Sequence, residues 1–124
     1  MSTDVRRPEP KNEFWTPERC FILETWNDAS DGVVSVARAR VEPGVTTQLH
    51  ALDGLDERYL VVEGTGRVEV AGEEATPVEA GDLVFIPAGA SQRITNTGSS
   101  DLMFYCICTP PFVPDAYVDL ESGD

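Results

Sequence analysis

Two glycine-bounded segments constrain the fold of this chain more than any other feature. The first runs from Gly44 to Gly66, and the second runs from Gly81 to Asn96. In both, short runs rich in Val, Leu, Ile or Phe alternate with polar residues and are interrupted by glycine, proline or asparagine. Glycine tolerates the positive φ angles of sharp turns, and an alternation of period two is typical of strands with one buried face. The segments therefore predict short strands joined by tight turns.

The rest of the chain continues this pattern, with turn residues about every 8–12 positions. This spacing is typical of an all-β sandwich or barrel, and no segment has the sustained apolar period of a long helix. Ala71-Gly72 predicts a tight hairpin turn, and Gly64 and Gly66 predict a sharp connection between the halves of a second hairpin. The expected strands cover residues 20–25, 33–41, 47–50, 58–63, 67–70, 76–78, 83–86, 92–96 and 102–108.

The spacing within the two segments is similar to that of the cupin superfamily. Cupin motifs read G-x5-H-x-H-x4-E-x6-G and G-x5-P-x-G-x2-H-x3-N, and this chain matches every spacing. Two identities differ, because Leu52 stands where the family has its second histidine and Gln92 where the second motif has its histidine. The resemblance covers about residues 33 to 110. It implies an all-β fold, a double-stranded β-helix or jelly-roll barrel with little helix.

The resemblance also implies where a metal would bind. Cupins commonly use three histidines and one glutamate that converge inside the barrel, and the corresponding ligands here are His50, Glu57 and Gln92. Amide oxygens are weak ligands for transition metals, so these residues predict at most a weakly held divalent ion such as Zn, Mn, Fe or Ni. A thiol of Cys106 or Cys108 is an alternative soft ligand.

The same positions allow a site without metal. Alternation places Gln48 on the strand face of His50 and Tyr59 on that of Glu57. With Gln92, these side chains would give an apolar cavity the few polar groups that are typical of a small-molecule site. His50, Glu57 and Tyr59 could also carry general acid–base chemistry. Metal-free cupins that catalyse isomerisation exist, so the sequence leaves open whether the protein is an enzyme.

Composition excludes some partners and predicts a location. The chain has 9 basic and 22 acidic residues and a formal net charge of −13, so its surface should repel nucleic acid. No apolar run approaches the roughly 20 residues needed to cross a bilayer, and the N-terminus lacks the apolar core of a secretory signal. We therefore expect a cytoplasmic protein with no membrane partner. Its three cysteines predict reduced thiols, most of them buried.

The length of 124 residues predicts a single domain. We expect a flexible N-terminal arm over residues 1–13 and one barrel domain over residues 14–124, with the proline-rich stretch 110–114 covering an edge or one end of the barrel. A homodimer is expected, because a chain of this size covers its sheet faces and edges poorly. Phe14, Trp15 and Phe21 are available for the interface.

The function that best fits these observations is binding of a small polar organic ligand in the barrel, without metal or with a weakly held one. The alternative is a metal-dependent cupin enzyme, an oxygenase or a sugar-type isomerase, that uses His50, Glu57 and Gln92 as a reduced ligand set. A third interpretation, a non-catalytic assembly protein, requires a barrel filled by apolar side chains.

Overall fold

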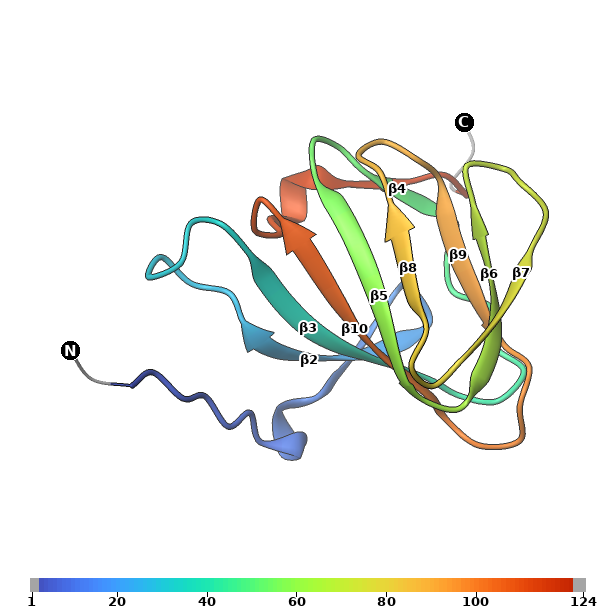
Figure 1. Ribbon diagram of the computed structural model, residues 1–124, viewed down its shortest axis with the longest axis horizontal. Helices are drawn as coiled ribbons and strands as arrows, with labels where there is room; N and C mark the ends of the chain where they lie inside the picture. Colours follow the sequence, from blue (N-terminus) through green and yellow to red (C-terminus); the bar gives the residue numbers. More distant parts are fainter. Residues whose placement is uncertain (1–2, 122–124) are drawn as a thin grey trace.

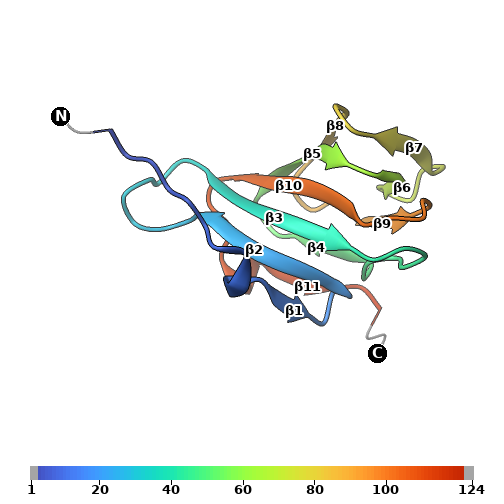
Figure 2. The same cartoon turned by 90° about the horizontal axis from the view of Figure 1, so that it is seen from below.

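Two antiparallel β-sheets pack face to face in the computed structural model, which describes residues 3–121 (Figures 1 and 2). The strands of the described residues are β1 Phe14–Thr16, β2 Cys20–Trp26, β3 Ser35–Val41, β4 His50–Leu52, β5 Asp56–Glu63, β6 Thr65–Val70, β7 Thr76–Glu79, β8 Leu83–Ile86, β9 Gln92–Asn96, β10 Leu102–Thr109 and β11 Tyr117–Asp119. One sheet has the order β1-β2-β3-β10-β5-β8 and the other has the order β11-β4-β9-β6-β7. This architecture confirms the predicted jelly roll.

Helix is confined, within residues 3–121, to two 3-10 turns, η1 Pro10–Asn12 and η2 Pro114–Ala116. None of the helices in this part of the chain is long and apolar enough to cross a membrane. The expected N-terminal arm and barrel domain include residues 1–2 and 122–124, which lie outside the described residues.

The strand predicted over residues 47–50 is wrong in position, because β4 begins only at His50. The reason is the side chain of Thr47, whose hydroxyl accepts a hydrogen bond from the Ile94 amide at 3.0 Å. A side-chain oxygen thus takes the place of a backbone carbonyl oxygen in the pairing with β9. The strand predicted from residue 33 also begins late, at Ser35. Asp31 explains this difference, since its carboxylate accepts the amide of Val33 at 2.8 Å and holds it in the preceding loop.

The predicted hairpin at Gly64 and Gly66 is wrong, because β5 and β6 belong to different sheets. The bend at Gly64 instead carries the chain from one sheet to the other, at the lower edge of Figure 1. Gly64 has a φ of +86°, and a Cβ atom there would lie 2.7 Å from the carbonyl oxygen of Asp101. The hairpin predicted at Ala71-Gly72 is confirmed, since β6 pairs with β7 across this turn.

The main core lies between the sheets and contains buried residues of both, such as Val61 of β5 and Ile94 of β9. Alternation along β5 buries Glu57, Tyr59 and Val61 on one face, as predicted. A second, smaller cluster of Leu52, Leu55, Cys108 and Ala116 lies near η2. The space between these two clusters contains the candidate site.

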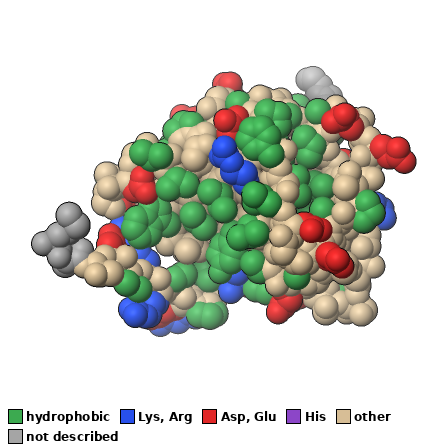
Figure 3. Space-filling model, viewed as in Figure 1, with side chains coloured by type: hydrophobic (Ala, Val, Ile, Leu, Met, Phe, Trp, Pro, Cys, Tyr) green, Lys and Arg blue, Asp and Glu red, His purple; other side chains and the backbone are tan. Residues whose placement is uncertain are grey.

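Apolar side chains also gather on the outer face of the six-stranded sheet (Figure 3). Val62, Leu83 and Phe85 are exposed there, and the Arg58 guanidinium lies over the Phe85 ring. An exposed apolar face of this kind is a common feature of subunit interfaces. The homodimer stays a prediction, with this face as a further candidate for the interface beside Phe14 and Trp15.

Candidate functional site

A cavity of about 310 Å³ lies between the sheets at the end of the barrel near η2. Its volume is at the lower end of the range for small-molecule sites. The barrel is therefore not filled by apolar side chains, which removes the condition that an assembly role requires. The lining residues are Phe14, Thr16, Glu18, Ile22, Glu24, Asn27, Ser35, Ala37, His50, Leu52, Glu57, Cys106, Cys108, Phe112, Pro114 and Tyr117.

Glu57 is the most unusual group in the cavity wall. Its position on the inward face of β5 leaves the residue only 5% exposed. The Oε1 atom of this side chain has no hydrogen-bond partner among the described residues. Burial raises the pKa of Glu57 to about 7, against smaller opposing interactions with Gln92, Cys106 and Cys108. Near neutral pH this carboxyl group can therefore either hold or release its proton.

His50 presents an unprotonated nitrogen at pH 7. Its Nδ1 lies 2.8 Å from the backbone carbonyl oxygen of Gln48, and because a carbonyl oxygen can only accept, Nδ1 carries the proton. Burial lowers the pKa of His50 below its ordinary 6.5, so the ring is neutral and Nε2 keeps its lone pair. The Tyr117 ring stacks on the imidazole with a centroid distance of 4.7 Å and fixes its plane.

Glu18 is a site residue that the sequence did not predict. It lies in the turn between β1 and β2, outside both cupin-like segments, and lines the cavity with Glu57. Burial and the neighbouring Glu57 raise the pKa of Glu18 to about 7. Tyr117 also lies outside both cupin-like segments and was therefore not predicted. It lines the cavity from β11, near the C-terminal end of the described chain.

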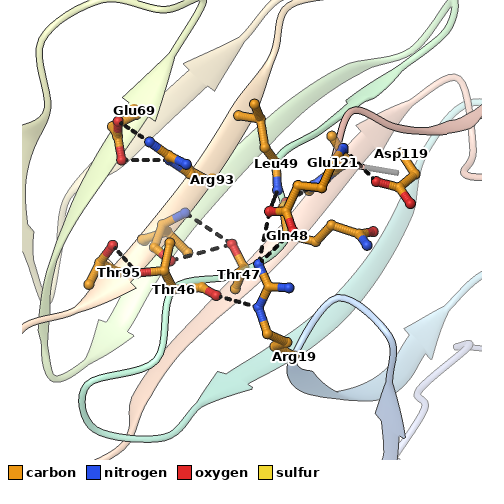
Figure 4. Close-up of polar contacts among 12 residues, drawn as sticks. Arg19, Thr46, Thr47, Gln48, Leu49, Glu69, Arg93, Thr95, Asp119 and Glu121 are labelled. Atoms are coloured by element: carbon orange, nitrogen blue, oxygen red, sulfur yellow. Dashed lines mark hydrogen bonds and ion pairs between the residues drawn. The ribbon is translucent and has the colours of Figure 1, made fainter. Parts of the chain in front are cut away.

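An arginine-centred network holds this part of the wall in place (Figure 4). Arg19, which follows Glu18, has an unusual φ of 70°. Its Nη2 donates to Oε2 of Glu121 at 2.8 Å, and the same carboxylate accepts the Leu49 amide at 2.7 Å. The Gln48 amide also donates to the Glu18 carbonyl oxygen at 2.9 Å. These contacts join the β1–β2 turn to the start of β4, so Glu18 and His50 are positioned together.

The other three predicted site residues, Gln48, Tyr59 and Gln92, do not line the cavity but pack next to it. The Tyr59 hydroxyl donates to Oε1 of Gln92, and Gln92 is completely buried. Neither residue is part of the cavity lining among residues 3–121. Gln48 precedes β4, and its Oε1 accepts the Tyr117 hydroxyl at 2.5 Å. Of the predicted set, His50 and Glu57 are therefore the two that reach the cavity surface.

The side chains at this point do not fit a transition-metal centre. The Oε1 atom of Gln92, the atom that could ligate, is already bonded to the Tyr59 hydroxyl. Leu52 packs in an apolar cluster where a further ligand would be needed. Within the described ranges, no group of three or more His, Cys, Asp or Glu side chains could hold a metal ion. His50 and Glu57 alone make a poor site for Zn, Mn, Fe or Ni.

The thiols of Cys106 and Cys108 both line the cavity, because residues two positions apart on strand β10 share one face. All three cysteines are free, and Cys20 and Cys108 are buried. Burial, followed by the nearby Glu57, raises the pKa of both cavity thiols. They are therefore protonated at pH 7 and are poor metal ligands and nucleophiles.

Comparison with known proteins identifies the family to which this fold belongs. The family model for the cupin domain matches residues 37–108. The chain therefore belongs to the cupin family. An oxalate-binding protein of Thermotoga maritima is 37% identical over 71 residues, which are 57% of this chain and 58% of that protein. The matched part thus spans less than two thirds of this relative.

Solved structures of similar fold agree with the family. A predicted oxalate decarboxylase from Thermotoga maritima has a TM-score of 0.73 at 25% identity, with 86% of this chain and 99% of that chain covered. A nucleoside dehydratase of Streptomyces has a TM-score of 0.76 at 18% identity, with 95% of this chain and 92% of that chain covered. At such low identity the second likeness shows the fold alone.

Proposed function

We propose that this protein binds a small polar organic ligand in the barrel cavity and does so without a metal. The observation that carries the proposal is the Glu57 Oε1 atom, buried at the wall of a cavity of about 310 Å³ and without a partner among the described residues. Leaving a buried polar group unpaired costs about 1–3 kcal/mol, and more for a charged one. A ligand that donates a hydrogen bond to Glu57 would remove this cost.

A relative supports a small-molecule role in general terms. The Thermotoga maritima protein that is 37% identical over 71 residues is named as an oxalate-binding protein. Oxalate is a small organic molecule, which suits the volume of the cavity.

Catalytic turnover of the bound ligand is a second candidate function. The cavity holds an unprotonated His50 Nε2 atom together with Glu18 and Glu57, each with a pKa of about 7. Groups with a pKa near the operating pH are the most efficient general acids and bases. In general acid–base catalysis, His50, Glu18 and Glu57 would exchange protons with the bound ligand.

The binding proposal is tested by NMR titration of the protein with benzyl alcohol, a small neutral probe. We expect the amide signals of cavity residues such as Glu57, Cys106 and Tyr117 to shift. Ala37→Phe places a ring in the cavity and should abolish these shifts, whereas Ala80→Phe, in the exposed turn before β8, should not. Shifts that are unchanged in a folded Ala37→Phe variant would contradict the proposal, and so would the absence of shifts in the natural protein with every probe of this shape, neutral or charged.

A further inference from the structure

The charged side chains of the cavity wall are all acidic. Glu18, Glu24 and Glu57 line it, and no lysine or arginine does so within residues 3–121. The arginine closest in sequence, Arg19, directs its guanidinium to Glu121 instead (Figure 4). A cavity with carboxyl groups and no cation is a poor place for an anionic ligand, because like charges repel strongly where water is excluded.

The hydrogen-bonding groups of the wall are mainly acceptors. Oε1 of Glu57 and Nε2 of His50 both have free lone pairs. The hydroxyls of Tyr117 and Thr16, in contrast, donate within the protein: Tyr117 donates to Gln48 at 2.5 Å, and Thr16 donates to the Cys20 carbonyl oxygen at 3.0 Å. The wall therefore offers acceptors to a ligand that brings its own donors.

Aromatic rings complete the wall. Phe14, Phe112 and Tyr117 line the same cavity as the carboxyl groups. An organic cation is attracted both by carboxylates and by the faces of aromatic rings, with cation–π contacts worth about 0.5–2 kcal/mol. An ammonium group also carries several N–H donors, which matches the excess of acceptors.

On the basis of the proposed function, we infer that the cavity selects organic cations. The ligand class is an aryl- or alkylamine, and Glu57 and Glu18 bind its ammonium group. The apolar part of the amine lies against Phe14, Phe112 and Tyr117. The cavity carries this inference independently of the acidic character of the chain, because Glu57, which is only 5% exposed, lines the cavity and its Oε1 atom has no hydrogen-bond partner among the described residues.

Titration of the carboxyl pair supports this inference. The pKa values of Glu18 and Glu57 are both raised to about 7, mainly by burial. A bound ammonium group would favour their ionised forms, so binding should release protons and strengthen as the pH rises from 6 to 8. At pH 7 none of the titratable groups around Glu57 and the cavity carries a positive charge: Glu18, Cys20, Glu24, His50, Tyr59, Cys106, Cys108 and Tyr117.

Three probes of one shape and different charge test the inference. Benzylamine is a cation at pH 8, benzyl alcohol is neutral, and benzoate is an anion. Dissociation constants are measured by NMR titration of the cavity amides at pH 6 and pH 8. At pH 8 we expect benzylamine to bind at least about tenfold more tightly than benzyl alcohol, and benzoate more weakly than either, as expected for one charge-assisted contact.

Matched variants assign the preference to the cavity. Glu57→Gln and Glu18→Gln should each reduce the preference for benzylamine over benzyl alcohol, whereas Glu42→Gln removes one negative charge from an exposed position away from the cavity and should leave the preference unchanged. Benzoate binding as tightly as benzylamine, or an equal loss of preference in Glu42→Gln, would overturn the inference. If none of the three probes shifts the cavity amides, the proposed function itself fails, and the inference with it.

Discussion

The two ends of the barrel differ in whether their buried polar atoms have hydrogen-bond partners. At the end away from the cavity, which we call the closed end, the bend at Gly64 between β5 and β6 lies against the backbone of Asp101 in the loop between β9 and β10. The Asn96 amide nitrogen there donates to the carbonyl oxygens of Val41 and Ser100, at 2.9 and 2.8 Å, and its Oδ1 accepts the Gly98 amide at 2.9 Å. Each polar atom of this side chain has a partner.

The cavity end leaves polar atoms without partners. Oε1 of Glu57 and Nε2 of Gln92 make no hydrogen bond to any described residue. Unpaired buried groups lower stability, and proteins keep them mainly where function needs them. The cupin-like glycines and Asn96 therefore stabilise the fold at one end of the barrel, while the residues that could bind a ligand lie at the other.

The largest effect is expected from restoring the two missing imidazoles at the cavity end. Leu52→His together with Gln92→His should create a tight Zn²⁺ site with His50 and Glu57. Gln92 is opposite His50 in the backbone register of β4 and β9, and Leu52 lines the same cavity as His50 and Glu57. We expect the dissociation constant for Zn²⁺, measured by calorimetry, to fall by more than about a thousandfold, or ~4 kcal/mol. Each single variant should gain less. A natural protein that already binds Zn²⁺ as tightly would break the comparison.

The closed end should respond to substitutions through stability alone. Gly64→Ala combines a φ of +86° with a Cβ contact of 2.7 Å to a backbone oxygen, and it should lower the free energy of unfolding by about 3–4 kcal/mol. Gly72→Ala is the matched control, because its φ is +72° and the added Cβ meets nothing within 4 Å. It should cost only about 1–2 kcal/mol in denaturant unfolding. Equal losses would show that the backbone approach at Gly64 is unimportant.

The cavity end should gain stability when Glu57 is neutralised. The pKa of Glu57 in the folded state, about 7, lies above its ordinary 4.5, so its contribution is favourable below pH 4.5 and is lost as the pH rises through 7. Glu57→Gln should therefore match the natural protein near pH 4.5 and exceed its unfolding free energy by up to about 3 kcal/mol at pH 8. Unfolding in urea across this range measures the difference. A constant difference at all pH values would exclude the buried carboxyl as its cause.

Much of the fold could be predicted from the sequence, because alternation and turn residues are local signals. The bounds of β8 and β9 are those predicted. Strand β5 begins two residues before its predicted start, and β10 ends one residue after its predicted end. The three-residue strands β1 and β11 were not predicted, since three residues are too few to establish an alternation. The bend at Gly64 was misinterpreted because a positive φ is needed both in a hairpin and in a crossing between sheets.

Less of the candidate site could be predicted. The motif spacing identified His50 and Glu57, which lie on regular strands of the barrel. Glu18 and Tyr117 reach the cavity from a turn and a terminal strand, and their positions depend on long-range contacts such as that between Arg19 and Glu121. No spacing rule in the sequence encodes those contacts. The proline after Thr16 is a local signal of a turn near Glu18, but it does not indicate where the Glu18 side chain lies.

Our main conclusion is that Glu57 is a buried carboxyl group at the cavity wall whose Oε1 atom has no hydrogen-bond partner among the described residues. The most direct measurement is a ¹³C NMR titration of its side-chain carboxyl carbon, assigned by the loss of the signal in Glu57→Gln. The account predicts a midpoint near pH 7, as burial raises the pKa to about that value. Addition of benzylamine should lower this midpoint. A midpoint near 4.5 in the free protein would show a solvated or paired carboxylate and would contradict the account.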